Sequence, residues 1–172
     1  KYDVPFIGIE PAIKPAAIQS KTQCIGILAT KGTLSSELFH KSVAKHPEVE
    51  IVEQIGHGLV QLIENGAINS SEMMDLLESY LQPMVEKNID YLVLGCSHYP
   101  YLIPKIKKII PNHIQIIDSG EAVAKQTQKI LKEKSLLNES NEKSLQRFYT
   151  NSDATVLKNI LSQQQDVSYR DF

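Results

Sequence analysis

The chain has 172 residues, 42% hydrophobic and 22% charged, with a formal net charge of -2. This balance is typical of a soluble globular protein and gives no electrostatic bias toward nucleic acid or an anionic membrane. Apolar runs are too short to span a bilayer and no charged leader precedes a cleavage site, so we expect a cytoplasmic protein.

Short β-rich runs alternate along the chain with longer segments of helical period. The runs begin at Val4, Cys24, Val49, Tyr91, Ile114, Arg147 and Val167. This alternation predicts an α/β fold with mostly parallel sheets flanked by helices. Several runs, such as "CIGILAT", are apolar throughout, as expected of strands covered on both faces.

Two helices are predicted between these runs. Asn69 followed by Glu72 indicates a helix start of the capping-box type. Behind it comes an apolar stripe at helical spacing: Met73, Leu77, Tyr80 and Met84. A second helix is expected after Asp118, with Ser119 as its cap. Its predicted buried stripe is Val123, Thr127, Ile130 and Leu131.

Ligands of an open α/β sheet gather at the carboxyl ends of the strands. Two stretches follow a strand and precede a helix: "ATKGT" at 29–33 and "GCSHYP" at 95–100. Gly95 allows a tight exit from the strand and Pro100 suits a first helical turn, so Cys96 and His98 are expected beside a helix amino end. Amides there and a nearby imidazolium predict a thiol pKa below its ordinary value of about 8.5.

The sequence contains two cysteines, Cys24 and Cys96, which is too few for a disulfide framework. Cys24 begins its strand and should lie roughly 20 Å from the carboxyl end, at about 3.3 Å per residue. We therefore expect Cys24 in the core. From composition alone, Cys96 as a buried small residue and His98 as a packed one remain the alternative.

The string "LGCSHYP" followed by "LIPKIKKII" resembles the motif around the second catalytic cysteine of the glutamate racemase family. Four more strings resemble that family in the same order: "PFIGIEPAIKPA" its crossing into the second domain, "IGILATKGT" its substrate loop, "GLVQLIENG" its glutamate-bearing helix and "IDSGEAVA" its return crossing. The resemblance implies an aspartate/glutamate racemase-like fold. It also implies a cofactor-independent isomerase that interconverts L- and D-glutamate and supplies D-glutamate for peptidoglycan, and thus for cell shape.

By this resemblance, Cys96 is one of two acid/base thiols that act on opposite faces of the α-carbon. His98 would support the Cys96 thiol or contact substrate, and Glu64 would orient His98. Glutamate would be bound by hydroxyls and amides of Thr30, Thr33 and Ser97, the last standing where most members have threonine. No metal and no cofactor is implied. Without the resemblance, Thr33 is equally well a helix cap, Glu64 a solvated last-turn residue and Tyr99 a packing residue.

The resemblance also divides the chain. Residues 1–9 would end a first-domain segment, 10–118 would form the second α/β domain, which carries Cys96, and 119–172 would return to the first domain. The family's early substrate loops and its other catalytic cysteine have no counterpart in these 172 residues, which open at Lys1. We therefore expect that the amino-terminal portion is missing, that the chain alone is inactive, and that the whole protein is a homodimer.

Two other functions remain open. An aspartate or hydantoin racemase would use the same paired cysteines on a shorter or cyclic substrate. A non-enzymatic α/β binding module would keep Cys96 only as a structural residue. Alkylation separates these classes, because an activated Cys96 should react with iodoacetamide well below pH 8.5 and be protected by glutamate.

Overall fold

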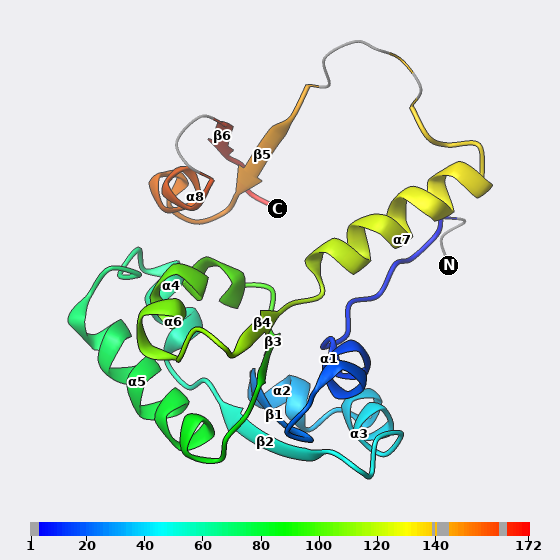
Figure 1. Ribbon diagram of the computed structural model, residues 1–172. Coiled ribbons are helices and arrows are strands. Elements are labelled where there is room, and N and C mark those ends of the chain that lie inside the picture. The colour runs from blue at the N-terminus through cyan, green and yellow to red at the C-terminus, as the bar shows by residue number, and fades with distance from the viewer. Residues whose placement is uncertain (1–3, 139, 141–144, 162–164) are drawn as a thin grey trace.

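The computed structural model describes residues 4–138, 140, 145–161 and 165–172. Within these residues the main sheet has four strands: β1 (Cys24–Ala29), β2 (Glu50–Ile55), β3 (Tyr91–Gly95) and β4 (Gln115–Ile117). All adjacent strands are parallel and their spatial order is β2-β1-β3-β4 (Figure 1). The predicted α/β class with a parallel sheet is confirmed.

Helices cover both faces of this sheet. One face packs against α4 (Leu59–Glu64), α5 (Ser71–Glu86), the short 3-10 helix η1 (Tyr99–Leu102) and α6 (Ile103–Ile109). The other face packs against α1 (Ile13–Gln19), α2 (Lys31–Leu34) and α3 (Glu37–Val43). All six residues of β1 are buried, with Leu28 in the first core and Ile27 in the second. This two-sided burial explains why the strand is apolar throughout.

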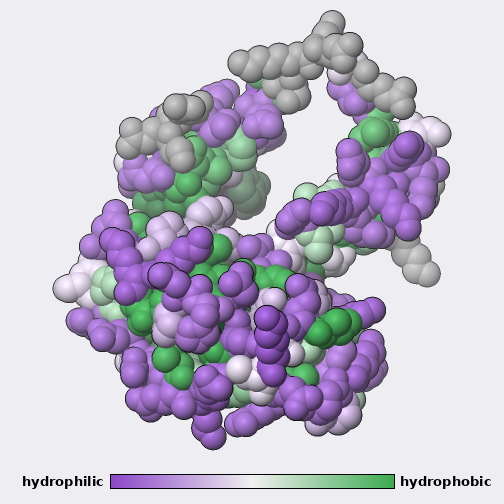
Figure 2. Space-filling model, viewed as in Figure 1, coloured by the Kyte–Doolittle hydropathy of each residue, from purple (hydrophilic) through white to green (hydrophobic). Residues whose placement is uncertain are grey.

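The chain beyond β4 leaves the main sheet. Helix α7 (Gly120–Glu133) extends away from it, and β5 (Arg147–Thr150), α8 (Ala154–Ile160) and β6 (Asp166–Tyr169) form a separate unit with two parallel strands (Figure 1). Ile160 of α8 packs against the core beneath α4 and α5. In Figure 2 the visible side of α7 is mostly hydrophilic, whereas hydrophobic residues gather on the unit of β5, α8 and β6.

Two predicted elements differ in the structure. The run from Val4 is not a strand, because no described strand lies beside it, and Val4 and Phe6 are 59% and 79% exposed. The stripe predicted to be buried on α7 is wrong, since α7 has no buried residue. The four residues of this stripe are nonetheless half-exposed, whereas every other residue of α7 is exposed. The pattern therefore identified the correct face of the helix, although no described element buries it.

Of the two predicted helix caps, one was misplaced and the other lies at the cap position without making a capping bond. Ser70, not Asn69, caps α5, because its hydroxyl accepts a hydrogen bond from the Met73 amide at 3.2 Å. Ser119 does occupy the first position before α7, but its hydroxyl donates to the Glu10 carbonyl and makes no capping bond. No helix among the described residues is long and apolar enough to cross a bilayer.

Candidate active site

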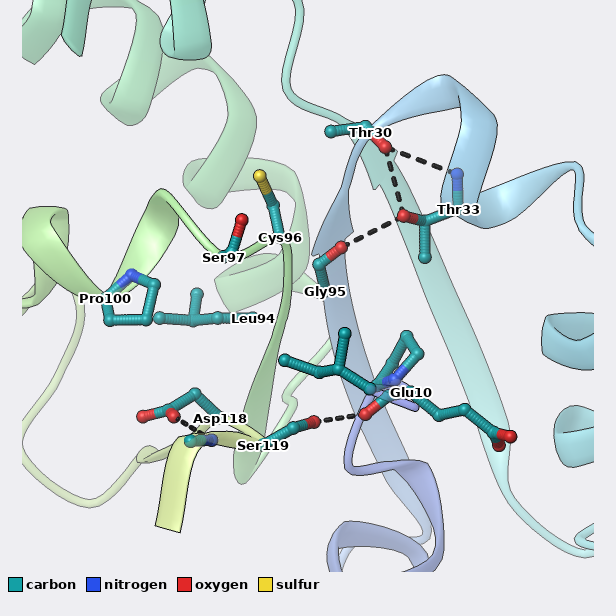
Figure 3. Close-up of a pocket in the computed structure, with 13 residues that line it drawn as sticks. Glu10, Thr30, Thr33, Leu94, Gly95, Cys96, Ser97, Pro100, Asp118 and Ser119 are labelled. Carbon is teal, nitrogen blue, oxygen red and sulfur yellow. Dashed lines mark hydrogen bonds between the residues drawn. The ribbon is translucent and has the colours of Figure 1, made fainter. Parts of the chain in front are cut away.

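A cavity of about 480 Å³ opens at the carboxyl ends of β1 and β3. Four segments line it: residues 9–11 before α1, the turn from β1 into α2, the turn after β3, and residues 118–120 at the start of α7 (Figure 3). This volume falls in the range of roughly 300–1,000 Å³ found for small-molecule sites. The position is the one expected for an open parallel sheet.

Thr30 and Thr33 form one wall of the cavity. Thr30 caps α2, since its Oγ1 accepts from the Thr33 amide at 3.2 Å. The Thr33 hydroxyl donates to the Gly95 carbonyl at 3.1 Å, and the two threonine hydroxyls lie 3.0 Å apart. Because the Thr33 proton is used on Gly95, the Thr30 hydroxyl is the donor between the pair. The cap is therefore Thr30, while Thr33 connects the end of β1 to the end of β3.

Cys96 and Ser97 lie across the cavity from these threonines, directly after β3 (Figure 3). Gly95 makes this arrangement possible, because a Cβ there would come within 2.7 Å of the Ala29 Cβ. The absence of a side chain lets the ends of β1 and β3 approach. Three of the residues predicted to bind substrate, Thr30, Thr33 and Ser97, thus line the same cavity as the thiol.

A row of three polar side chains runs from the cavity wall to the surface. Cys96 Sγ lies 3.9 Å from His98 Nδ1, and His98 Nε2 lies 3.1 Å from Glu64 Oε1 at the end of α4. The side chains of His98 and Glu64 are 33% and 60% exposed, and neither residue lines the cavity. The structure therefore brings together the thiol, imidazole and carboxylate that the sequence singled out, with the imidazole behind the thiol.

The pKa of Cys96 differs from the sequence prediction. Burial raises the pKa of the thiol, the amides of His98 and Tyr99 lower it, and the charge of Glu64 raises it further, so the net direction is upward. The prediction of a lowered pKa is wrong because the sulfur packs against the core and the helix beside it is only the four-residue η1. The resting group is a thiol at neutral pH.

The second cysteine, Cys24, lies at the opposite end of the strands, where β1 begins. Cys24 opens β1 and is 5% exposed, whereas the other end of β1, Ala29, pairs with Gly95 beside Cys96. Burial raises the pKa of Cys24, as do the charges of Glu50 and Asp90, while Lys87 opposes them. Cys24 is a core residue, as predicted.

The sequence reading missed the fourth side of the cavity. Ser119, the buried polar residue there, donates to the Glu10 carbonyl and so joins the segment before α1 to the start of α7 (Figure 3). Asp118 accepts from the Gly120 amide at 2.6 Å. The only signal was the "DSG" string itself, since a bond between residues 109 positions apart leaves no local pattern. Among the described residues, no group of three or more His, Cys, Asp or Glu side chains is placed to hold a metal ion.

Comparisons with known proteins point to one family. The family model for Asp/Glu/Hydantoin racemase matches residues 1–127. A glutamate racemase of Pseudomonas entomophila (strain L48) is 40% identical over 160 residues, which cover 92% of this chain and 60% of the relative. One of Ralstonia pickettii (strain 12J) is 46% identical over 126 residues, covering 73% and 45%. The chain thus spans about 60% of the length of the first of these relatives.

Solved structures show the same fold. A glutamate racemase from Bacillus anthracis matches with a TM-score of 0.79 and 27% identity, covering 99% of this chain and 66% of that one. The Escherichia coli glutamate racemase, solved with L-glutamate and the activator UDP-MurNAc-ala, matches with a TM-score of 0.81 and 26% identity over 98% of this chain and 66% of that one. The family match over most of the residues and the curated relatives carry the conclusion: this chain belongs to the Asp/Glu/Hydantoin racemase family.

Proposed function

We propose that this chain carries one acid/base half of a glutamate racemase, with Cys96 as the reacting thiol. The observation that supports this most is the placement of Cys96 on the wall of a cavity, with three hydroxyl-bearing residues around it and an imidazole–carboxylate pair behind it. Glutamate is the preferred substrate because the curated relatives are named glutamate racemases.

Inversion of an α-carbon requires that a proton leave from one face and return to the other. Cys96 would donate the proton in one direction and, as thiolate, remove it in the other. A positioned acid or base contributes roughly 10²- to 10⁴-fold to such a step. The raised pKa of Cys96 suits the donor role, since the group waits protonated at neutral pH. No cofactor is needed for this exchange.

The neighbouring groups take supporting roles in this proposal. Ser97, Thr30 and Thr33 would bind the carboxylates and ammonium of glutamate through hydroxyls and amides. His98 would support proton transfer at Cys96 Sγ, with Glu64 fixing the ring through Nε2. A thiol on the opposite face would come from the remainder of the family fold, against which residues 1–9 and 119–172 would pack.

The cellular part of the proposal follows from this reaction. D-glutamate made in the cytoplasm would supply peptidoglycan synthesis and so maintain cell shape, and the whole enzyme would be a homodimer. An aspartate or hydantoin racemase is the second candidate, because the family description includes both. A binding module with a structural Cys96 is the third.

The test is alkylation of the 172-residue chain by iodoacetamide, followed by mass spectrometry of the two cysteine peptides. We expect Cys96 to react and Cys24, buried in the core, to remain largely unmodified. Glutamate at about 10 mM, above usual KM values of roughly 1 μM to 1 mM, should slow the reaction of Cys96 more than equal aspartate. Stronger protection by aspartate would favour the second candidate, and an unprotected or inert Cys96 would overturn the proposed role.

A further inference from the structure

Tyr99 is fully buried and joins the turn that carries Cys96 to the loop after β2. Its hydroxyl donates to the Gly56 carbonyl at 3.1 Å, and its amide donates to the Cys96 carbonyl at 3.2 Å. The Gly56 amide in turn donates to the Ala29 carbonyl at 2.9 Å. Tyr99 thus links the turn after β3 to the loop after β2, and the backbone bond of Gly56 connects that loop to the end of β1.

This link is matched by a second one on the other side of the turn. The Thr33 hydroxyl holds the Gly95 carbonyl, immediately before Cys96, while Tyr99 holds the turn immediately after it. Between these two bonds lie only three residues, 96–98. The thiol turn is therefore fixed at both ends by residues far away in the sequence.

Gly56 is shaped to receive the tyrosine. A Cβ at this position would overlap the Tyr99 hydroxyl and would come within 2.8 Å of Leu59 Cδ1. Space, rather than backbone conformation, is what calls for glycine here. Simple packing of an aromatic ring does not require its hydroxyl to lie so close to a backbone carbonyl, so the contact is a specific one.

The orientation of this turn determines where the neighbouring backbone amides lie relative to the Cys96 sulfur. The amides of His98 and Tyr99 act on Cys96 and lower its pKa against the opposing effect of burial. Hydrogen bonds weaken steeply when donor and acceptor are misaligned. A small rotation of the turn would therefore weaken the stabilisation of the thiolate without unfolding the sheet.

We propose that Tyr99 is a positioning residue, whose hydroxyl bond to the Gly56 carbonyl fixes the turn that places Cys96 on the wall of the cavity. This inference rests on the proposed acid/base role of Cys96, which gives the orientation its purpose. It assigns to Tyr99 more than the packing role expected from the sequence.

The titratable groups near Cys96 are few among the described residues. His98 comes from the same turn and Glu64 from α4, while Asp118 and Glu10 line other sides of the cavity and Tyr80 of α5 acts on Tyr99. Tyr80 offers a matched control, because its hydroxyl donates to the His57 carbonyl at 3.0 Å, one residue beyond Gly56. Tyr80→Phe removes the same kind of bond from the same loop without altering the turn itself.

The test compares the pH dependence of Cys96 alkylation in the wild-type chain, Tyr99→Phe and Tyr80→Phe, over about pH 7 to 10.5. We expect Tyr99→Phe to move the midpoint upward by about half a pH unit, which makes alkylation at pH 8 about threefold slower. Tyr80→Phe should coincide with wild type. A loss of fold stability alone would not move this midpoint, and circular dichroism checks that each variant is folded.

A second variant tests the same contact if Tyr99→Phe does not fold. Gly56→Ala displaces the hydroxyl from the other side and should move the midpoint in the same direction. If the midpoint in Tyr99→Phe equals that of the wild-type chain, or if Tyr80→Phe shifts it equally, the positioning role is overturned and the proposed function is left intact. A wild-type Cys96 that never reacts would overturn both.

Discussion

Glu64 and the backbone amides act on Cys96 in opposite directions. The carboxylate raises the pKa of the thiol, because a nearby negative charge disfavours the thiolate. We therefore predict that Glu64→Gln lowers the midpoint of Cys96 alkylation. The effect should be modest, about a twofold faster reaction at pH 8 and low ionic strength, since the Glu64 side chain is 60% exposed and water screens its charge.

The comparison that isolates this charge is Glu72→Gln, which removes an exposed carboxylate in the first turn of α5 and should leave the midpoint unchanged. Salt provides a second check, because the difference between wild type and Glu64→Gln should shrink toward about 1 M NaCl. An upward shift in Glu64→Gln would mean that Glu64 acts on the thiol mainly through its contact with the His98 ring.

Asp90, the residue before β3, stabilises the fold in a way that depends on pH. Burial raises the pKa of its carboxyl, but hydrogen bonds from the Ser20 hydroxyl and the amides of Lys21 and Thr22 outweigh this and lower it. A lowered pKa in the folded state stabilises the fold above the ordinary value of about 3.9, and this is lost as pH falls below it.

We predict that Asp90→Asn lowers the free energy of unfolding at pH 7 by about 1–3 kcal/mol, because an NH₂ group then faces donors. The difference from wild type should begin to diminish below about pH 3.9, where the carboxyl of the unfolded wild-type chain takes up a proton first, and should fall further toward pH 3. Urea unfolding at the two pH values measures this. A difference of the same size at both would show that the charge of Asp90 contributes nothing.

At the scale of elements, apolar runs that are buried on both faces were the best predicted. The runs at β1 and β3 are apolar throughout and became central strands. The run at Val4 has similar residues but no described neighbour, and a strand needs a partner for its backbone groups. The face of α7 was likewise identified but not covered, since periodicity shows which side is apolar and not what packs on it.

The candidate site also has parts that could be predicted from the sequence and parts that could not. The residues at the strand ends were predictable, because parallel strands bring their carboxyl ends to one edge, and resemblance supplied the roles of His98 and Glu64. The bonds of Tyr99 to Gly56 and of Ser119 to Glu10 were not predictable, because they join distant segments. The pKa of Cys96 was predicted with the wrong sign, since sequence shows the nearby helix start but not the burial of the sulfur.

The start of α5 provides a test at this scale. Ser70 makes the capping bond to the Met73 amide, whereas Asn69, the cap expected from sequence, instead accepts from Lys105 Nζ at 2.7 Å on the surface. We predict that Ser70→Ala lowers the free energy of unfolding by about 1 kcal/mol. Asn69→Ala should cost less than about 0.5 kcal/mol, as an exposed substitution. Chemical denaturation measures both losses of unfolding free energy. A larger loss in Asn69→Ala than in Ser70→Ala would mean that Asn69 is the cap.

At the scale of the whole molecule, the parallel sheet separates the two thiols. Cys24 opens β1, and five residue steps, roughly 17 Å, separate it from Ala29, which pairs with Gly95 just before Cys96. Two groups that exchange protons with one α-carbon must each come within hydrogen-bond reach of it. These two sulfurs cannot meet at one substrate without loss of the sheet.

We therefore predict that the 172-residue chain alone does not interconvert the enantiomers of glutamate, although it binds glutamate beside Cys96. Circular dichroism of L-glutamate incubated with the chain should stay constant, while the same sample shows glutamate-dependent protection of Cys96 from iodoacetamide. Cys24→Ala should behave as wild type in both measurements, and Cys96→Ala should show no protection because the reporter thiol is gone. Turnover that disappears in Cys96→Ala but persists in Cys24→Ala would mean that one thiol, with a proton donor other than Cys24, suffices for inversion.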